Sequence, residues 1–422
     1  MISPRVVLLP LAWALAVGPS VSRAAGDESA DAPIGIRAFG EISTWFDRVG
    51  DERVPIEQQP LREPGNRALT PPRLRRDGLQ PRIAAIVELN DNVLLTAEDR
   101  RPGHALIVSP GLNWIERAPR YRVEVDMSIE ALKSLSSALD DQSIDAATVQ
   151  AFATGQPSER TSAVYLGTLL HSHDPGVVLP GLQETVGNQR FASDFAYHQL
   201  GLGWRSTPQT DLETRFIATR ARSDVPDFIP TDGQDIEVAA RWRPEFGHRI
   251  GVRLRDRSAR FADRPTLKYR SLWAELESQL SPTLLVTAAV APTRGTGGDD
   301  LILWRLTLLQ TFRDGQWEGA LEREVTAPGG LGAVYEVRSL RVGASWRIGH
   351  SSRLEASVQL ARYSSRADAD NLRTLRARLS YSVPLAPQWW FNLRYQGIED
   401  EIEADDFRRR GNRVMATLLW TL

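Results

Sequence analysis

Hydrophobic and polar residues alternate along most of the chain beyond residue 81. In residues 121–131 the odd positions are Tyr, Val, Val, Met, Ile and Ala, and the even positions are Arg, Glu, Asp, Ser and Glu. Because successive side chains of a strand point to opposite faces, this alternation predicts a strand with one apolar and one charged face. About 9–11 residues is the length of a tilted strand that crosses a membrane.

An arginine-rich segment, residues 249–257, alternates in the same way. Its odd positions hold Arg249, Gly251, Arg253, Arg255 and Arg257, and its even positions include Ile250, Val252 and Leu254. In a soluble sandwich the apolar face would pack inward and the arginines would face water. In an outer-membrane barrel the apolar face would meet lipid and the arginines would line the lumen. This segment alone fits both architectures.

The remaining alternating segments follow one another to the end of the chain. They occur at 82–95, 104–115, 161–172, 194–205, 210–222, 234–243, 248–261, 266–280, 283–293, 300–313, 316–326, 333–347, 352–364, 371–383, 388–398 and 411–422, whereas 145–154 fits poorly. With 121–131 they predict roughly 18 strands, within the even-numbered range of bacterial barrels.

Short and long connections alternate between these segments. Short ones lie at 206–209, 244–247, 281–282, 314–315, 348–351 and 384–387, and long ones at 173–193, 223–233, 294–299, 327–332, 365–370 and 399–410. This rhythm is typical of transmembrane barrels, which have tight periplasmic turns and larger outer loops.

Seven tryptophans stand where predicted strands meet short connections or the C-terminus. They are Trp114, Trp204, Trp242, Trp317, Trp346, Trp389 and Trp420, and each falls on the apolar face of its strand. Aromatic rings on one rim, facing lipid at headgroup level, predict a membrane-interface girdle. A soluble core would scatter them along the strands.

Both ends of the chain agree with a membrane destination. Residues 1–24 contain Arg5, an apolar run and Ser22-Arg23-Ala24, which predicts a cleaved secretory signal peptide. No later segment offers roughly 18 apolar residues for a spanning helix. The last strand alternates up to Leu422 and resembles the C-terminal signal read by the outer-membrane assembly machinery, with Leu in place of the usual aromatic residue.

The amino-acid composition excludes several classes of site and of binding partner. The chain has no Cys, and Ala25 follows the expected cleavage site, so disulfides, thiolate metal sites and a lipoprotein anchor are excluded. The formal charge of −2 becomes −4 once residues 1–24 are removed, which is not the balance of a nucleic-acid binder. Residues 25–81 are rich in proline and predict a periplasmic extension or linker before a barrel at 82–422.

Arginine is the main candidate for solute contact on the expected lumen face. The candidates are Arg241, Arg243, Arg249, Arg253, Arg255, Arg257, Arg305, Arg341, Arg347, Arg376, Arg378 and Arg394. In one interpretation their guanidinium groups bind an anionic solute; in the other they pair with Glu and brace the wall. Few acids lie near residues 241–257 in the sequence, so we expect some of these arginines to lack acidic partners.

No recognised catalytic or cofactor motif is present. The sequence has neither a G-x-S-x-G elbow nor a phosphate-binding glycine loop. His171 and His173 lack an obvious third ligand, so we predict no metal site. The acidic segment 399–406 predicts a solvated outer loop, bridged to lipopolysaccharide phosphates by divalent ions, or a Ca²⁺ site.

Two short pieces carry a family resemblance. They are Glu88-Leu89-Asn90-Asp91-Asn92-Val93 and Ser109-Pro110-Gly111-Leu112. Together they resemble the start of a family of outer-membrane β-barrel porins associated with exopolysaccharide gene clusters. The resemblance covers residues 82–422 and implies a part in polysaccharide export, with an anionic polysaccharide and periplasmic export components as partners. It transfers no catalytic or binding residue.

The sequence therefore predicts an all-β protein: a transmembrane, antiparallel, up-and-down β-barrel of about 16–18 strands in the outer membrane. The first functional hypothesis is a conduit that assists export of an anionic exopolysaccharide. The second is a general or anion-selective uptake porin. The third is an outer-membrane enzyme acting on polysaccharide or lipid, which would need a Ser/His or Asp/His pair meeting across neighbouring strands.

Overall fold

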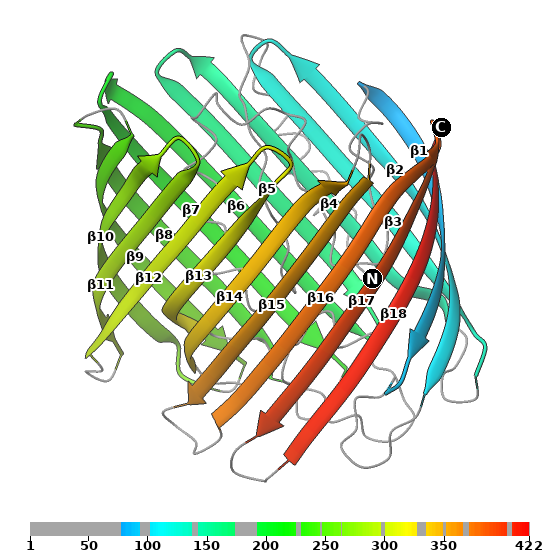
Figure 1. Ribbon diagram of the computed structural model, residues 1–422. Helices are drawn as coiled ribbons and strands as arrows, with labels where there is room; N and C mark the ends of the chain where they lie inside the picture. The colour runs from blue at the N-terminus through cyan, green and yellow to red at the C-terminus, as the bar shows by residue number, and fades with distance from the viewer. Residues whose placement is uncertain are drawn as a thin grey trace.

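The computed structural model describes twelve segments of the chain. These are residues 77–92, 102–136, 142–173, 192–224, 229–244, 247–262, 264–296, 300–326, 335–348, 352–365, 371–402 and 407–421. Eighteen antiparallel strands form one sheet, in which each strand pairs with its neighbours in sequence and β1 also pairs with β18. The sheet is therefore closed into a barrel of tilted strands (Figure 1). No helix that could cross a membrane is found among the described residues.

The strands have the following bounds: β1 Gly78–Asn90, β2 Gly103–Ala118, β3 Tyr121–Ser134, β4 Gln142–Ser158, β5 Thr161–Ser172, β6 Ser193–Thr207, β7 Thr210–Ser223, β8 Thr231–Trp242, β9 His248–Phe261, β10 Leu267–Ser281, β11 Leu284–Gly295, β12 Asp300–Phe312, β13 Gly315–Thr326, β14 Tyr335–Ile348, β15 Ser352–Ser365, β16 Asn371–Ala386, β17 Trp389–Ile402 and β18 Phe407–Thr421. Tight turns such as 119–120, 208–209 and 387–388 alternate with longer connections at the other end of the barrel. We call these the short-turn end and the long-loop end.

Two predicted boundaries are wrong. The barrel begins at Gly78 rather than at residue 82, and β1 includes Pro81. Proline is tolerated there because the pairing with β18 starts only at Arg82, so residues 78–81 pair with β2 alone. The second boundary is near the C-terminus. Strand β17 continues to Ile402, so the first residues of the predicted loop at 399–406 belong to a strand. The signal peptide and most of the predicted 25–81 extension lie outside the described residues.

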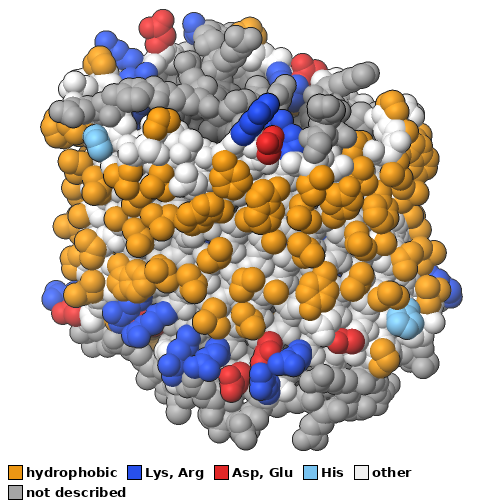
Figure 2. All heavy atoms as spheres, viewed as in Figure 1, with side chains coloured by type: hydrophobic (Ala, Val, Ile, Leu, Met, Phe, Trp, Pro, Cys, Tyr) orange, Lys and Arg blue, Asp and Glu red, His pale blue; other side chains and the backbone are white. Residues whose placement is uncertain are grey.

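The arginine-rich segment settles which face points outward. Ile250, Val252 and Leu254 are 47%, 52% and 53% exposed, whereas Arg253 and Arg255 are 6% and 5% exposed. Arg255 also contacts Glu324 on β13, four strands away, which is possible only through the interior of the barrel, so the arginines point inward and the exposed apolar residues point outward. On the face of the barrel that Figure 2 shows, hydrophobic side chains form a belt, with charged side chains above and below it. This is the surface of a barrel that spans a membrane.

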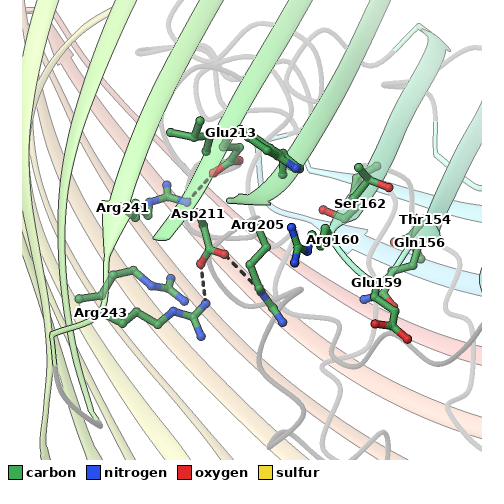
Figure 3. Close-up of a pocket in the computed structure, with 16 residues that line it drawn as sticks. Thr154, Gln156, Glu159, Arg160, Ser162, Arg205, Asp211, Glu213, Arg241 and Arg243 are labelled. Carbon is green, nitrogen blue, oxygen red and sulfur yellow. Dashed lines mark hydrogen bonds and ion pairs between the residues drawn. The ribbon is translucent and has the colours of Figure 1, made fainter. Parts of the chain in front are cut away.

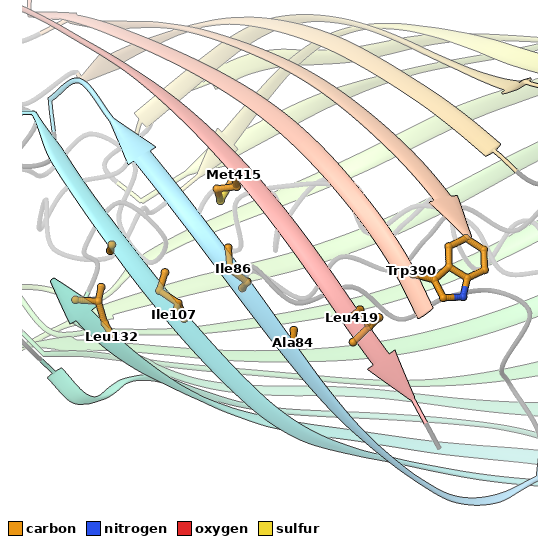
Figure 4. Packing of buried hydrophobic residues seen from close by; sticks show 8 residues of the cluster. Ala84, Ile86, Ile107, Leu132, Trp390, Met415 and Leu419 are labelled. Atoms are coloured by element: carbon orange, nitrogen blue, oxygen red, sulfur yellow. The ribbon is translucent and has the colours of Figure 1, made fainter. Parts of the chain in front are cut away.

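Asn90, Asp91 and Asn92, from the first segment of the family resemblance, lie where the barrel closes. Asp91 accepts hydrogen bonds from the backbone N and the Nδ2 of Asn412, both at 2.6 Å, and Asn92 Nδ2 donates to the carbonyl of Arg410 at 2.9 Å. These contacts join the long-loop end of β1 to β18. On the inner side of the same seam, buried apolar residues of β1, β2, β3, β17 and β18, including Ile86, pack together (Figure 4).

The second segment of the resemblance, Ser109-Pro110-Gly111-Leu112, interrupts the pairing of β2 with β3. β2 pairs with β3 up to Val108 and again from Gly111, and the two residues between them, Ser109 and Pro110, take no part. Proline has no N–H to donate, which explains the gap.

Candidate functional site

Charged side chains line the inner wall of the barrel, and on one side arginines and carboxylates are interleaved. We call this group the paired wall. It comprises Arg215, Arg241, Arg253, Arg255, Arg257 and Arg305 together with Glu213, Asp235, Glu237, Glu275, Glu322 and Glu324, on strands β7 to β10, β12 and β13. Six cations therefore face six carboxylates, and the paired wall is close to neutral.

Arg255 is the most connected member of the paired wall. Its Nη2 lies 2.6 Å from Asp235 Oδ2, and its Nε lies 3.0 Å from Glu237 Oε1, both on the adjacent strand β8. Its Nη1 also lies 3.8 Å from Glu324 on β13, four strands further round the barrel. Arg257 makes a similar long reach, donating to the backbone carbonyl of Val325. The strands between carry short inward side chains, such as Ser271 and Ala291, that leave room for these contacts.

The expectation that some arginines in residues 241–257 lack acidic partners is wrong. Arg253 Nη2 lies 2.6 Å from Glu275, Arg249 Nη1 lies 3.7 Å from Glu277, and Arg243 Nη2 lies 3.0 Å from Asp211. The partners come from β7, β8, β10 and β13, which are distant in sequence but neighbours or near neighbours round the barrel. The interpretation of a bracing ladder therefore fits this part of the wall.

The opposite side of the wall has a different charge balance. On the inner face of residues 374–382 of β16 and 390–396 of β17 stand three arginines and no carboxylate: Thr374, Arg376, Arg378, Ser380, Ser382, Trp390, Asn392, Arg394 and Gln396. We call Arg376, Arg378 and Arg394 the β16–β17 arginine cluster. In the pairing of β16 with β17, Arg394 lies opposite Ser380, and Gln396 lies opposite Arg378. The three arginine side chains therefore extend from neighbouring positions on two adjacent strands.

Two acids on strands that flank this part of the wall already hold other arginines. Glu355 Oε1 lies 2.7 Å from Arg353 Nε, and Glu88 Oε1 lies 3.2 Å from Arg413 Nε. Arg376 makes no hydrogen bond or ion pair with any residue that the structure describes, and its Nε is buried. Arg378 and Arg394 both have other interactions, so Arg376 is the member of the cluster whose donors meet no described acceptor. Donors of this kind are suited to an anion.

The other predicted arginines either pair with an acid or lie at the short-turn end. Arg341 Nη2 lies 2.7 Å from Glu318. Arg305 belongs to the paired wall, 2.6 Å from Glu324. Arg347 is exposed at the short-turn end of β14, and Arg243 is half-buried at the same end.

The seven predicted girdle tryptophans lie near the short-turn end, on positions that alternate with the inner wall. Trp204, Trp242, Trp346 and Trp389 are exposed, and Trp114, Trp317 and Trp420 are half-buried. The rings of Trp389 and Trp420, on adjacent strands, have centroids 6.5 Å apart. Their contact with the lipid interface stays a prediction.

Sequence reasoning missed several members of the inner wall. Asp235 and Glu213 fall on the same parity as Glu237 and Arg241, so the alternation of β7 and β8 contained the signal. Arg215, which contacts Glu213 at 2.9 Å and Glu237 at 3.1 Å, was missed for the same reason. Trp273 is also buried on the inner face, where it shares the parity of Glu275 and Glu277.

Two histidines on the outer face pair with a side chain of an adjacent strand. His248 Nδ1 lies 3.0 Å from Ser278 Oγ, and the described residues give this imidazole no carboxylate partner. His171 Nδ1 lies 2.8 Å from Asp194, and its ring stands edge-on to that of His173 at 5.1 Å. No group of three or more possible metal ligands is found in the described part of the chain.

The strand pairing, the apolar outer belt and the charged inner wall define a transmembrane β-barrel. No protein-family model matches the chain, and no curated protein matches it. Among solved structures it is similar to OccAB4 of Acinetobacter baumannii (10% identity over 82% of this chain and 99% of that chain, TM-score 0.44). It is also similar to Pseudomonas aeruginosa OpdK with vanillate (11%, 82% and 98%, TM-score 0.45) and to the P. aeruginosa siderophore receptor PirA (8%, 82% and 80%, TM-score 0.42). The assignment of the fold rests on this chain's own strand pairing.

Proposed function

We propose that the protein is a passive conduit across the outer membrane for small anionic solutes. The observation that carries this proposal is the β16–β17 arginine cluster, where three arginines and no carboxylate stand on the inner face over residues 374–382 of β16 and 390–396 of β17. Guanidinium groups bind carboxylate and phosphate through paired N–H donors. A cationic inner surface also raises the local concentration of anions.

In this proposal the paired wall braces the barrel and the β16–β17 arginine cluster selects the solute. The arginines and carboxylates of the paired wall balance, so it adds little net field to the lumen while linking β7 to β13. The preference for anions then depends on the β16–β17 arginine cluster. In this proposal the short-turn end faces the periplasm, as in other transmembrane barrels.

The test is the reversal potential of the purified protein in planar bilayers under a KCl gradient. We expect selectivity for anions, and we expect Arg376→Ser, Arg378→Ser and Arg394→Ser together to reduce it strongly. The matched control removes three exposed arginines at the long-loop end, Arg220, Arg270 and Arg294, which are 65%, 76% and 79% exposed. Absence of conductance, or equal selectivity in both triple variants, would overturn the proposal.

Export of an anionic exopolysaccharide, which the family resemblance implies, is the use of the same conduit in the opposite direction. It stays a prediction. Deletion of the gene should leave polymer in the periplasm if the conduit exports it. Normal surface polymer together with slower entry of small anions would assign the conduit to uptake.

A further inference from the structure

A second cluster of arginines surrounds a cavity at the short-turn end of the inner wall. The cavity has a volume of about 100 Å³ and lies between the turn at 159–160 and the strands β6 to β9. Its charged lining residues are Arg160, Arg205, Arg241, Arg243, Arg249, Glu159, Asp211 and Glu213. We call it the mouth pocket. Figure 3 shows Arg160, Arg205 and Arg243 gathered around it, with Asp211 between Arg205 and Arg243.

Cations outnumber carboxylates in the mouth pocket by five to three. One carboxylate, Asp211, is shared by two arginines: Oδ2 lies 3.0 Å from Arg243 Nη2, and Oδ1 lies 3.5 Å from Arg205 Nε. Each guanidinium has five N–H donors, so two arginines that share one carboxylate keep N–H donors that this carboxylate does not accept. Those of Arg205 are accessible, because this side chain is 47% exposed.

Arg160 adds a second accessible guanidinium. It lies in the turn between β4 and β5, and its side chain is exposed. Among the residues that the structure describes, it forms hydrogen bonds through its backbone alone: N with Ser158 Oγ and O with the N of Arg205. The contact between the Arg205 backbone N and the Arg160 carbonyl, at 2.7 Å, fixes the two residues beside each other. The uncharged polar lining residues are Thr154, Gln156, Thr161 and Ser162.

We propose that the mouth pocket binds an oxyanion with more than one charged oxygen, such as a phosphate or a dicarboxylate, with Arg160 and Arg205 as its principal donors. The volume exceeds that of a few waters and suits a group of this size. The proposal deepens the proposed function and rests on it, because it gives the conduit a second anion site where solute meets the periplasmic mouth. Binding itself can be measured without transport.

The test uses the refolded full-length protein in detergent, with inorganic phosphate and citrate as probes and isothermal titration as the readout. We expect Arg160→Ser with Arg205→Ser to weaken binding by about tenfold or more. The control, Arg270→Ser with Arg294→Ser, removes the same charge from the long-loop end and should bind as the parent does. Arg160→Lys keeps the charge but loses the paired donors, so it should fall between.

Folding is checked by gel mobility and transport by conductance, each independently of the binding measurement. Both arginines have accessible side chains, so the double variant should keep the shift in gel mobility that boiling produces. Equal binding in the double variant and the control would overturn the mouth pocket as a site, even if the barrel conducts anions. Loss of binding in the double variant from a barrel without conductance would leave the pocket standing and overturn the proposed conduit.

Discussion

Arg82 on β1 binds Asp126 on β3, although β2 lies between them. Nη2 and Oδ1 are 2.6 Å apart, and both side chains are largely buried. The arginine crosses β2 at Gly111, where a Cβ would lie 2.5 Å from Arg82 Nε. Arg241 on β8 reaches Glu275 on β10 in the same way, over Gly251 of β9. In both places the glycine serves close approach by a side chain rather than a turn.

This crossing predicts that Gly111→Ala destabilises the barrel. The added Cβ would meet Arg82 and also the backbone carbonyl of Met127 at 2.9 Å, which cannot move aside as a side chain can. We expect a loss of about 1–3 kcal/mol, measured as the free energy of unfolding in urea. Gly343→Ala is the matched control, because its nearest neighbours are at 3.9 Å. Equal effects at both glycines would contradict the crossing.

Most of the fold could be predicted from alternation, because a closed barrel with lipid outside imposes one apolar face on every strand. Strand β4 fitted poorly because alanine stands on both of its faces and Phe152 points inward. The ion pairs could not be predicted. Arg255 contacts Asp235 on an adjacent strand and Glu324 four strands away, and such pairing depends on register and curvature rather than on sequence distance.

The buried contacts of Arg255 predict a strong coupling with Asp235. Arg255→Gln leaves a fully buried carboxylate without its main partner, and removal of one member of a buried pair costs about 3–5 kcal/mol. Adding Asp235→Asn should restore much of this loss, because the unpaired charge is then gone. The measurement is a double-mutant cycle on the free energy of unfolding in urea. Additive losses would show that the two residues do not stabilise each other.

The outer belt predicts a sharp difference between the two faces of the barrel. Leu254 lies opposite Val238 and Leu272, which are also exposed, so Leu254→Arg would place a charge in lipid. We expect a cost of about 2–4 kcal/mol near the bilayer midplane. Thr287→Arg, on the inner face opposite Glu277, should cost little. Unfolding of both variants from lipid vesicles compares them, and a larger cost for Thr287→Arg would reverse the assignment of inside and outside.

Selectivity measurements can separate arginines that brace the wall from arginines that meet the solute. Changing Arg253, Arg255 and Arg257 to Ser does not do so, because it strands their carboxylate partners and shifts the lumen toward cations whichever role the arginines have. A pair of substitutions that leaves the net charge unchanged can separate the two roles. Arg255→Gln with Asp235→Asn removes one charge of each sign, so we expect the reversal potential of the parent protein. Arg376→Gln removes a positive charge that no described acid balances, and it should lower the preference for anions. If the neutral pair of changes lowers selectivity as much as Arg376→Gln does, then Arg255 contacts the permeating anion and the paired wall belongs to the pathway.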